Sequence, residues 1–350
     1  MPIDVLEMTM DQLCQAVVGA GFEPYRAKQI ADWVYKKGAT DPATMSNLPA
    51  PLMNQIRVLT SRVADRADST DGTVKLLLEL HDGEHIETVL IPAQTRATAC
   101  LSTQVGCGLA CSFCATGLDG LRRNLTSGEM LQQLLHLQQA CGRRVTNIVL
   151  MGMGEPLANY DATVSAVRAI TDGQRFGISA RSVTISTIGL PKQIRRLAAE
   201  RLPITLAISL HAPNDPLRRR LIPVAARIPL KKIISAAEAF YESRKREVTL
   251  EYVLIGGVND TSLCAEGLAR IARQIRCNVN LISYNPVDSL PYQPPTQVAV
   301  KAFASRLRRR GVNVHVRRSR GLDVSAACGQ LRQHATEATT RGSDNRKETH

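Results

Sequence analysis

Aromatic residues are scarce in this chain. They make up 4% of its 350 residues, with one tryptophan, five phenylalanines and seven tyrosines. Proteins that bind single-stranded nucleic acid by stacking its bases use an open platform of aromatic side chains. That mode of recognition is therefore not expected here, and any affinity for nucleic acid would rest on phosphate and shape contacts.

Long apolar runs are also missing. No stretch approaches the roughly eighteen uninterrupted apolar residues that predict a membrane-spanning helix. The first residues, Met1-Pro-Ile-Asp-Val-Leu-Glu, lack the basic and apolar regions of a signal peptide. We therefore expect a cytoplasmic protein that has no membrane partner. Its nine cysteines, an odd number, are then not expected to form structural disulfides.

Acidic residues are outnumbered by basic ones. The chain has 31 Asp and Glu against 44 Lys and Arg, a formal net charge of +13. Such a charge predicts a polyanionic partner, most readily nucleic acid, because neutralised phosphates release their counterions. Charge that only keeps the protein in solution is the alternative. Local clustering favours the nucleic acid, and the dense groups lie in the later half of the chain: Arg218–Arg220, Lys231–Lys232, Arg306, Arg308–Arg310, Arg317–Arg318 and Arg320.

Residues 1–58 are predicted to form a small helical accessory domain. Thr9-Met-Asp-Gln12 fits a capping box, and a second amphipathic run with several lysines ends at Gly38. The basic face of these helices could dock RNA. A cap that only buries the neighbouring domain explains the pattern equally well.

Residues 59–95 are predicted as a β-hairpin region. Apolar side chains alternate with polar ones over 73–91, on both sides of a turn at Asp82-Gly83. At the other end of the chain, the tail 333–350 is polar and lacks any period. We expect it to be disordered.

The main domain, residues 96–332, alternates strand-like and helix-like patterns. Strands are predicted at 97–103, 146–151, 182–187, 204–210, 248–255, 278–283 and 312–316. Helices are predicted at 126–141, 160–172, 231–243, 261–275 and 296–310. This alternation predicts an α/β fold with a parallel sheet and right-handed crossovers, either a β/α barrel or part of one.

The unusual motifs of the main domain come at the ends of predicted strands. The carboxyl ends of parallel barrel strands meet at one rim, where catalytic groups collect. We therefore expect these motifs to converge in space. In strand order they are Cys107–Cys114, Gly152–Pro156, Ser186, Ser209–His211, Gly256-Gly257 and Asn285-Pro286.

Three cysteines dominate the chemistry that the sequence predicts. Cys107, Cys111 and Cys114 have the spacing C-x3-C-x2-C, which offers three thiolates from one short loop. A [4Fe–4S] cluster is held by thiolates, and three of them leave one iron open for another ligand. A zinc site or buried free cysteines are the alternatives. Zinc sites with this kind of spacing usually have a second Cys or His pair downstream, and no such pair follows here.

This cysteine spacing is the hallmark of the radical S-adenosylmethionine (SAM) enzymes. Further motifs make the chain resemble the RlmN/Cfr family of RNA adenine methyltransferases, over about residues 5–332. The resemblance implies a partial (β/α)6 radical-SAM barrel, with the N-terminal helical accessory domain and the β-hairpin as additions. The motifs that carry it are Arg96–Cys107, Met151-Gly-Met-Gly-Glu-Pro156, Ser209-Leu-His-Ala-Pro-Asn214 and Arg320–Gln330.

The resemblance also implies a SAM-binding pocket. The glycines before Glu155 would let the backbone approach SAM closely. The carboxylate of Glu155 would accept a hydrogen bond from the amino group of SAM. Taken singly, a glycine run is more often a tight turn, and a single Ser or His on a loop is more often structural. It is their shared rim position that supports the set. The implied SAM-binding residues are Gly154, Glu155, Ser186, Ser209, Leu210, His211 and Asn285.

In this family a further pair of cysteines takes part in the reaction. By resemblance, Cys328 is methylated by one SAM, and a second SAM gives a 5′-deoxyadenosyl radical that takes a hydrogen from the S-methyl group. The resulting methylene radical adds to an adenine carbon. Glu87 is the matching proton acceptor, and Cys100 forms a transient disulfide with Cys328 that releases the methylated base. A buried apolar role is the alternative for both cysteines, and is the one expected for Cys14, Cys141, Cys264 and Cys277.

The implied function is methylation of adenine carbon 2 in 23S ribosomal RNA, with transfer RNA as a second substrate. It implies a [4Fe–4S] cluster, two SAM molecules per turnover and an electron donor such as flavodoxin, and we expect a monomer. Cfr-like methylation of adenine carbon 8 is the nearest alternative, because both branches share all the motifs. A radical SAM enzyme that modifies protein, or an RNA-binding protein with a structural cluster, are alternatives of a different class.

Overall fold

A single mixed sheet of ten strands organises the protein. The computed structural model describes residues 2–332, so the tail predicted to be disordered lies outside the described residues. The strand order is β14-β13-β12-β11-β10-β9-β6-β5-β4-β3. None of the helices within 2–332 is long and apolar enough to cross a membrane.

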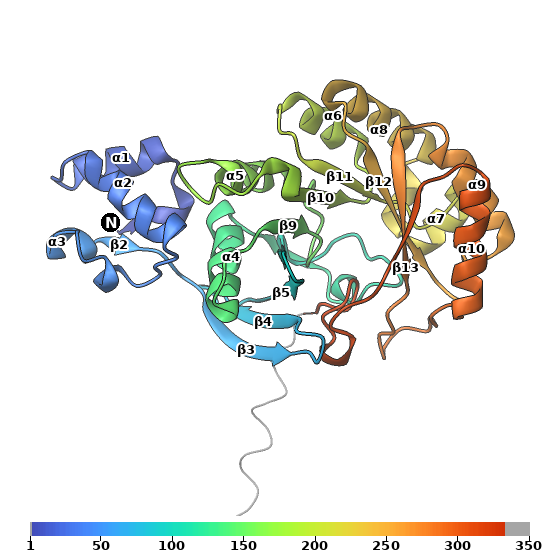
Figure 1. The fold of residues 1–350 in the computed structure, drawn as a ribbon, viewed down its shortest axis with the longest axis horizontal. Helices are drawn as coiled ribbons and strands as arrows, with labels where there is room; N and C mark the ends of the chain where they lie inside the picture. Colours follow the sequence, from blue (N-terminus) through green and yellow to red (C-terminus); the bar gives the residue numbers. More distant parts are fainter. Residues whose placement is uncertain (1, 333–350) are drawn as a thin grey trace, which may run out of the picture.

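Seven strands of this sheet are parallel and curve into an open barrel (Figure 1). Six of them match the predicted barrel strands and the seventh extends the edge, as the alternating pattern predicts. The strands are β6 (Ala97–Cys100), β9 (Asn147–Leu150), β10 (Val183–Thr187), β11 (Thr205–Ser209), β12 (Val248–Leu254), β13 (Cys277–Ser283) and β14 (Val314–Arg317).

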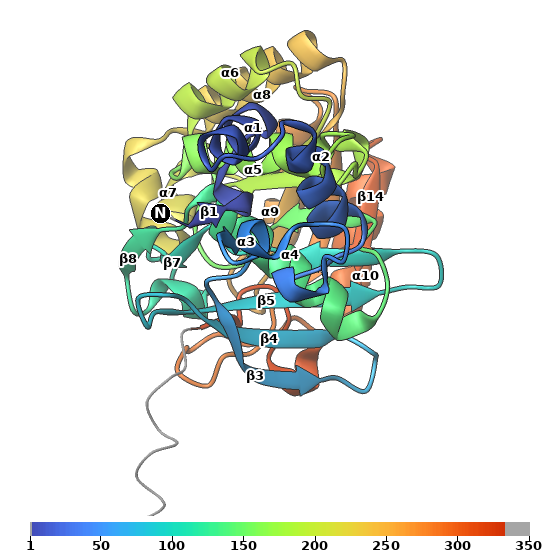
Figure 2. The same cartoon turned by 90° about the vertical axis from the view of Figure 1, so that its left-hand side faces the viewer.

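Three antiparallel strands continue the sheet beyond β6: β3 (Arg62–Asp68), β4 (Val74–Glu79) and β5 (His85–Pro92). Figure 2 shows them side by side below the barrel. The hairpin expected over 73–91 corresponds to β4 and β5, and Gly83 in its turn has a positive φ of 81°. The sequence analysis did not predict β3, because its exposed residues carry no alternation of apolar and polar side chains.

Helices cover the outer face of the parallel strands. The first of them, α4, begins with a capping box in which Thr126 and Glu129 exchange hydrogen bonds with each other's backbone. The short α6 and α7 were not among the predicted helices. The helices are α4 (Ser127–Cys141), α5 (Tyr160–Thr171), α6 (Pro191–Ala199), α7 (Asp215–Leu221), α8 (Leu230–Arg244), α9 (Ser262–Ala272) and α10 (Gln297–Arg309).

The N-terminal helices form a compact module against α4 and α5 (Figure 1). The capping box predicted at Thr9 and Gln12 is present. Glu7 joins the module to the barrel, since its carboxylate accepts the hydroxyl of Thr126 and the N–H of Gly128 at the start of α4. The elements are β1 (Ile3–Asp4), α1 (Met10–Gly19), α2 (Tyr25–Ala31) with a π-helical turn at Asp32–Lys36, α3 (Ala50–Met53) and β2 (Ile56–Arg57).

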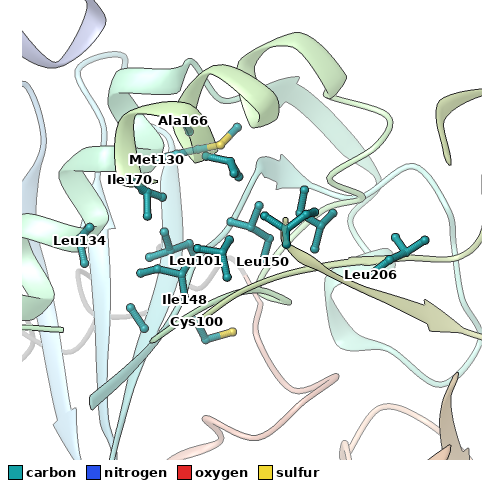
Figure 3. Close-up of a cluster of buried hydrophobic side chains, with 14 of the residues drawn as sticks. Cys100, Leu101, Met130, Leu134, Ile148, Leu150, Ala166, Ile170 and Leu206 are labelled. Atoms are coloured by element: carbon teal, nitrogen blue, oxygen red, sulfur yellow. The ribbon is translucent and has the colours of Figure 1, made fainter. Parts of the chain in front are cut away.

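The main core lies between the sheet and the helices. Figure 3 shows Leu101, Ile148 and Leu150 of the sheet packed toward side chains of α4 and α5 such as Met130 and Ile170. All five are essentially inaccessible to solvent. Because side chains alternate along a strand, the residues between these apolar ones point into the barrel interior. This alternation decides which groups reach the candidate site.

Candidate active site

The loop 107–117 lies between two short paired strands, β7 (Gln104–Gly106) and β8 (Leu121–Asn124). Cys107 donates its backbone N–H to the carbonyl of Gly120 at 2.8 Å. Gly106 has a φ of +74°, and a Cβ there would lie 2.0 Å from that same carbonyl oxygen. Only glycine tolerates this approach, so Gly106 fixes where the loop leaves the strand.

The three thiols of this loop line one cavity, as the sequence predicts. Burial and, to a smaller extent, the neighbouring thiols raise the pKa of Cys107 to about 11 and that of Cys111 well above its ordinary value. Thiolates gathered in this way need a metal centre to compensate their charge. No group of three or more His, Cys, Asp or Glu side chains within 2–332 is arranged to hold a single metal ion. A [4Fe–4S] cluster fits the loop better, since each thiolate binds a different iron.

The carboxyl ends of the barrel strands complete this cavity, which we call the cluster cavity. It holds about 920 Å³ of empty space, which includes the part open to solvent. Leu210 is the one predicted SAM-binding residue that does not line it, and its side chain is fully buried. The predicted residues that do line it are Gly154, Glu155, Ser186, Ser209, His211 and Asn285, together with Cys328.

Glu155 is the buried carboxylate at the end of β9. Gly154 before it has a φ of +101°, and a Cβ there would lie 2.6 Å from the Cβ of Gln104, so glycine is needed for this close packing. The carboxylate accepts the N–H groups of Leu157 at 3.0 Å and of Ile188 at 2.9 Å. Burial raises the pKa of Glu155 to about 7. A cationic group bound in the cavity would favour its ionised form.

Hydroxyls and an imidazole line the neighbouring wall. The hydroxyl oxygens of Ser186 and Ser209, on β10 and β11, lie 3.3 Å apart. His211 has a positive φ of 58°, and its Nδ1 accepts the N–H of Val253 at 3.1 Å. Burial lowers the pKa of His211 to about 3, so the ring is neutral and carries its proton on Nε2. The wall therefore offers neutral hydrogen-bonding groups.

Glu251 also lines the cluster cavity, and the sequence analysis missed it. Its side chain lies on β12, and Oε1 accepts the amide of Asn280 at 2.9 Å. Oε2 is buried and has no hydrogen-bond partner within residues 2–332. Burial raises the pKa of this carboxyl group. A carboxylate inside an otherwise apolar strand was the signal that could have identified it, because buried polar groups normally have partners.

Arg218 is buried, which corrects the sequence analysis. The sequence groups it with Arg219 and Arg220 as a basic cluster predicted to bind nucleic acid, but its exposed fraction is 0%. Its guanidinium donates to the carbonyls of Ile188 and Leu210, and burial lowers its pKa to about 10. Charge clustering in the sequence does not distinguish a surface arginine from one that packs beneath a loop. Arg218 therefore stabilises the base of the cavity and does not belong to the surface charge.

Cys100 points into the barrel, on the opposite side of its strand from the helices. Figure 3 shows it at the far end of the apolar cluster from Met130 and Ala166. Its neighbours Ala99 and Leu101 are buried on the other side of the strand. Burial, with a smaller contribution from the nearby Cys328, raises the pKa of the Cys100 thiol to about 12. The two cysteines are thus brought close although they lie far apart in the sequence.

A second cavity lies between Cys100 and Cys328, and we call it the arginine cavity. It holds about 670 Å³ of empty space, which includes the part open to solvent. Cys328 lines both cavities, so it stands in the wall between them. Exclusion of water by the surrounding protein raises the pKa of the Cys328 thiol, and the guanidinium of Arg317 lowers it in part. The remaining walls are Ile91, Val149, Met151, Ile282, Asn285, Arg318, Ser319, Arg320, Ala326, Ala327 and Leu331.

The segment 318–332, which we call the C-terminal strap, carries Cys328 across the open side of the barrel. Near its start, Asp323 accepts the hydroxyl of Ser69 at 2.6 Å and the N–H of Thr70 at 3.0 Å. Near its end, the carbonyl of Gly329 accepts the N–H of Ala115 in the cysteine loop at 2.8 Å. The strap is therefore fixed at two places, to the β3–β4 turn and to the loop that would hold the cluster.

Asn285 holds the C-terminal strap through two hydrogen bonds. Its amide nitrogen donates to the carbonyl of Cys328 at 3.0 Å, and its Oδ1 accepts the hydroxyl of Ser319 at 2.6 Å. Asn285 lines both cavities. It can therefore lie beside SAM, as predicted, and hold the strap at the same time.

Glu87 lies on β5, on the same face as Val89, which pairs with Cys100 in the register of the sheet. Its carboxylate forms an ion pair with Lys75 at 2.7 Å and accepts the backbone N–H of Arg332 at 2.8 Å. Glu87 is absent from the walls of both cavities described above. Its strand β5 pairs with β6, which carries Cys100, so Glu87 lies near the cysteine pair. The backbone of Arg332, at the end of the strap, contacts its carboxylate.

Comparison with known proteins places this geometry in a family. Residues 101–265 match the model of the radical SAM superfamily, and residues 3–60 match that of the ribosomal RNA large subunit methyltransferase N-terminal domain. The probable dual-specificity RNA methyltransferase RlmN of Thermosynechococcus vestitus is 47% identical over 320 residues, which are 91% of this chain and 94% of that protein. This chain belongs to the RlmN family of radical SAM RNA methyltransferases.

Other members agree. The protein of the same description from Synechococcus elongatus is 44% identical over 344 residues, covering 96% of this chain and 95% of the relative. The crystal structure of a radical SAM methyltransferase from Sphaerobacter thermophilus has a TM-score of 0.91 at 43% identity, covering 94% of this chain and 99% of that one. The predicted fold class and family are thereby confirmed. Membership in the RlmN family implies an iron–sulfur cluster and SAM, which the cysteine loop and its cavity fit.

Proposed function

We propose that this enzyme methylates carbon 2 of an adenosine in 23S ribosomal RNA and in transfer RNA through an S-methylcysteine at Cys328. The observation that carries the proposal is the position of Cys328 in the wall between two cavities, with Cys100 lining the second. A thiol that only filled the core would not need access to both. The relatives at 47% and 44% identity are described as RlmN, which supports carbon 2 over carbon 8.

Residues of the cluster cavity would hold both cofactors. Cys107, Cys111 and Cys114 would bind the [4Fe–4S] cluster, and Glu155 would accept the amino group of SAM. The unpartnered oxygen of Glu251 would accept a hydroxyl or ammonium hydrogen of the same molecule. When bound, the cluster and SAM supply the methyl group and the radical chemistry that an adenine carbon requires.

The protein residues then have separate tasks. Cys328 presents the carbon that is transferred, and Asn285 fixes its backbone by the hydrogen bond to its carbonyl. Cys100, as the thiolate, then attacks the sulfur of Cys328. The sulfur–sulfur bond forms, the bond from that sulfur to the transferred carbon breaks, and the carbon keeps the electron pair and takes up a proton to become the methyl group. The odd electron left on the base by the radical addition would return to the bound cluster. Glu87 takes up the proton lost from the adenine carbon. The end of the strap covers its carboxylate, so this segment must move before Glu87 can act.

Further elements of the proposal concern partners. Two SAM molecules are used for each base, since one provides the methyl group and the other the radical. An electron donor such as flavodoxin reduces the cluster. We infer a monomer that acts in the cytoplasm, where its RNA substrates are found.

Mass spectrometry of nucleosides tests this function. Ribosomal and transfer RNA are isolated from a host that lacks its own enzyme of this family and expresses this protein, its Cys328→Ala variant or its Cys141→Ala variant. We expect 2-methyladenosine with the wild type and Cys141→Ala, and none with Cys328→Ala. Only 8-methyladenosine would move the enzyme to the Cfr branch. Neither product, from protein with a full complement of iron, would point to a protein substrate and contradict the proposal.

A further inference from the structure

The two cavities that meet at Cys328 differ sharply in charge. The charged side chains of the cluster cavity are the carboxylates Glu155 and Glu251, beside the three cysteines of the loop. The arginine cavity has three arginines in its wall and no carboxylate within the described residues. One cavity is thus suited to a cationic ligand and the other to an anionic one.

The arginines of the second cavity are weakly neutralised. The guanidinium of Arg317 lies 3.9 Å from Glu251, and that of Arg320 lies 3.8 Å from Asp71. Both pairs are long. The pair of Arg320 with Asp71 is open to solvent and contributes little. Glu251 is buried at the wall of the cluster cavity, so at this distance it neutralises Arg317 only in part. Arg318 is exposed and forms no hydrogen bond or ion pair with any of the residues 2–332. The mouth of the cavity therefore keeps a positive charge that is available to an external phosphate.

Below the arginines the cavity is apolar. Ile91 comes from β5, Val149 from β9 and Ile282 from β13, so strands from both sides of the barrel opening form its walls, and Leu331 of the strap adds a fourth apolar side. Most of the other residues that line it are also apolar or carry sulfur, and Asn285 and Ser319 are the two uncharged polar ones: Cys100, Met151, Asn285, Ser319, Ala326, Ala327 and Cys328. Apolar walls below a basic mouth match a nucleotide, whose base is a flat weakly polar ring and whose backbone is anionic.

We propose that the arginine cavity is the subsite for the target nucleotide of the RNA, with the base between the apolar walls beside Cys328 and a flanking phosphate on Arg318 and Arg320. This inference rests on the proposed function. It separates the two substrates: SAM occupies the cluster cavity, the base occupies the arginine cavity, and Cys328 reaches both from the shared wall. The base must leave its stack to enter, and the phosphate contacts hold the flanking backbone while it does so.

A second basic cavity does not suit this role. It lies between the N-terminal module and the end of α4, and it is lined by Lys36, Lys37, Arg143 and Arg144. Three of these cations donate to backbone carbonyls of the protein, and Lys37 lies 3.5 Å above the ring of Trp33. This cavity lies at the C-terminal end of α4, just before β9 begins. It is therefore on the side of the barrel where the strands begin, away from their carboxyl ends and from Cys328. Its charges stabilise the junction of the two parts.

Binding measurements on the full-length, cluster-loaded protein test the subsite. The probe is a labelled transcript of the peptidyl-transferase region of 23S ribosomal RNA, and its Kd is measured over a range of salt concentrations. We expect Arg318→Ala to raise the Kd about tenfold and to reduce the slope of log Kd against log salt by about one, since one phosphate contact is lost. Arg318→Lys should restore most of the affinity, because a lysine also binds phosphate.

Arg181→Ala is the matched control, since Arg181 is an exposed arginine just before β10, belongs to none of the basic groups and lies outside both cavities. It should leave Kd and slope unchanged. Iron content and thermal unfolding of each variant show whether it has folded. An unchanged Kd in Arg318→Ala, or an equal change in Arg181→Ala, would overturn the subsite. If the wild type binds the RNA through Arg318 but yields no methyladenosine, the subsite holds and the proposed function fails.

Discussion

The two groups of reactive cysteines in this protein are built in different ways. Cys107, Cys111 and Cys114 come from one short loop whose start is fixed by Gly106, a position where any side chain would collide with the backbone. Cys100 and Cys328 come from the first barrel strand and from the C-terminal strap, and they meet only because the barrel closes part of the way. The first group depends on local geometry, whereas the second depends on nearly the whole main domain.

This difference implies different sensitivities. Loss of one loop cysteine should affect only the cluster and what depends on it. A change far from Cys328 in the sequence should be able to misplace it, because the strap is fixed through the β3–β4 turn and the cysteine loop. The three predictions that follow test this contrast, in order of decreasing expected effect.

The largest effect is expected for Cys111→Ala. With two thiolates left in the loop, the cluster is not retained, and the methylation rate should fall by at least about a thousandfold. Iron and sulfide analysis with the visible absorbance of the purified protein measures the cluster directly. Cys141→Ala, at the end of α4 and outside both cavities, should keep full iron content. A Cys111→Ala protein that kept its iron would disprove the assignment of the loop.

A smaller and different effect is expected for Cys100→Ala. The cluster should remain, but without the partner thiol the base is not released, so protein should accumulate covalently bound to RNA. A protein–RNA band that survives denaturation measures this product. Cys277→Ala is a close control, because burial raises the pKa of both thiols to about 12 and only Cys100 lines the arginine cavity. Release of product at the wild-type rate would exclude a role for Cys100.

The smallest effect is expected for Asp323→Ala. This change removes the acceptor for Ser69 and Thr70 and loosens the strap at one end, while Asn285 and Gly329 still hold the other. Single-turnover methylation should slow by about twofold to tenfold with the cluster intact, because a poorly positioned reactive group is less effective. Hydrogen exchange of the strap should rise in parallel. Asp288→Ala, at an exposed position, should change neither, and a cluster loss in Asp323→Ala would contradict the contrast between the two groups.

Much of the barrel could be predicted from its sequence, because each strand is a short apolar run followed by a helix with its own period. The antiparallel strand β3 could not, since its residues are exposed and polar. Within the site, glycine and cysteine motifs predicted which residues line the cluster cavity. Glu251 and Arg218 were missed or misplaced, because burial of a charged side chain depends on what packs around it and leaves no pattern along the chain.

The sequence by itself determined the family, the cysteine loop and the order of strands and helices, because these depend on spacing and periodicity over short distances. Only the tertiary structure decided that Cys328 stands in the wall between two cavities, that one of these is basic, and that Arg318 has no hydrogen-bond or ion-pair partner among residues 2–332. The physical reason is that charge balance and access to a cavity are set by groups from distant segments. Strand alternation places each such side chain inside the barrel, but the neighbours that it meets there depend on how the barrel and the strap close.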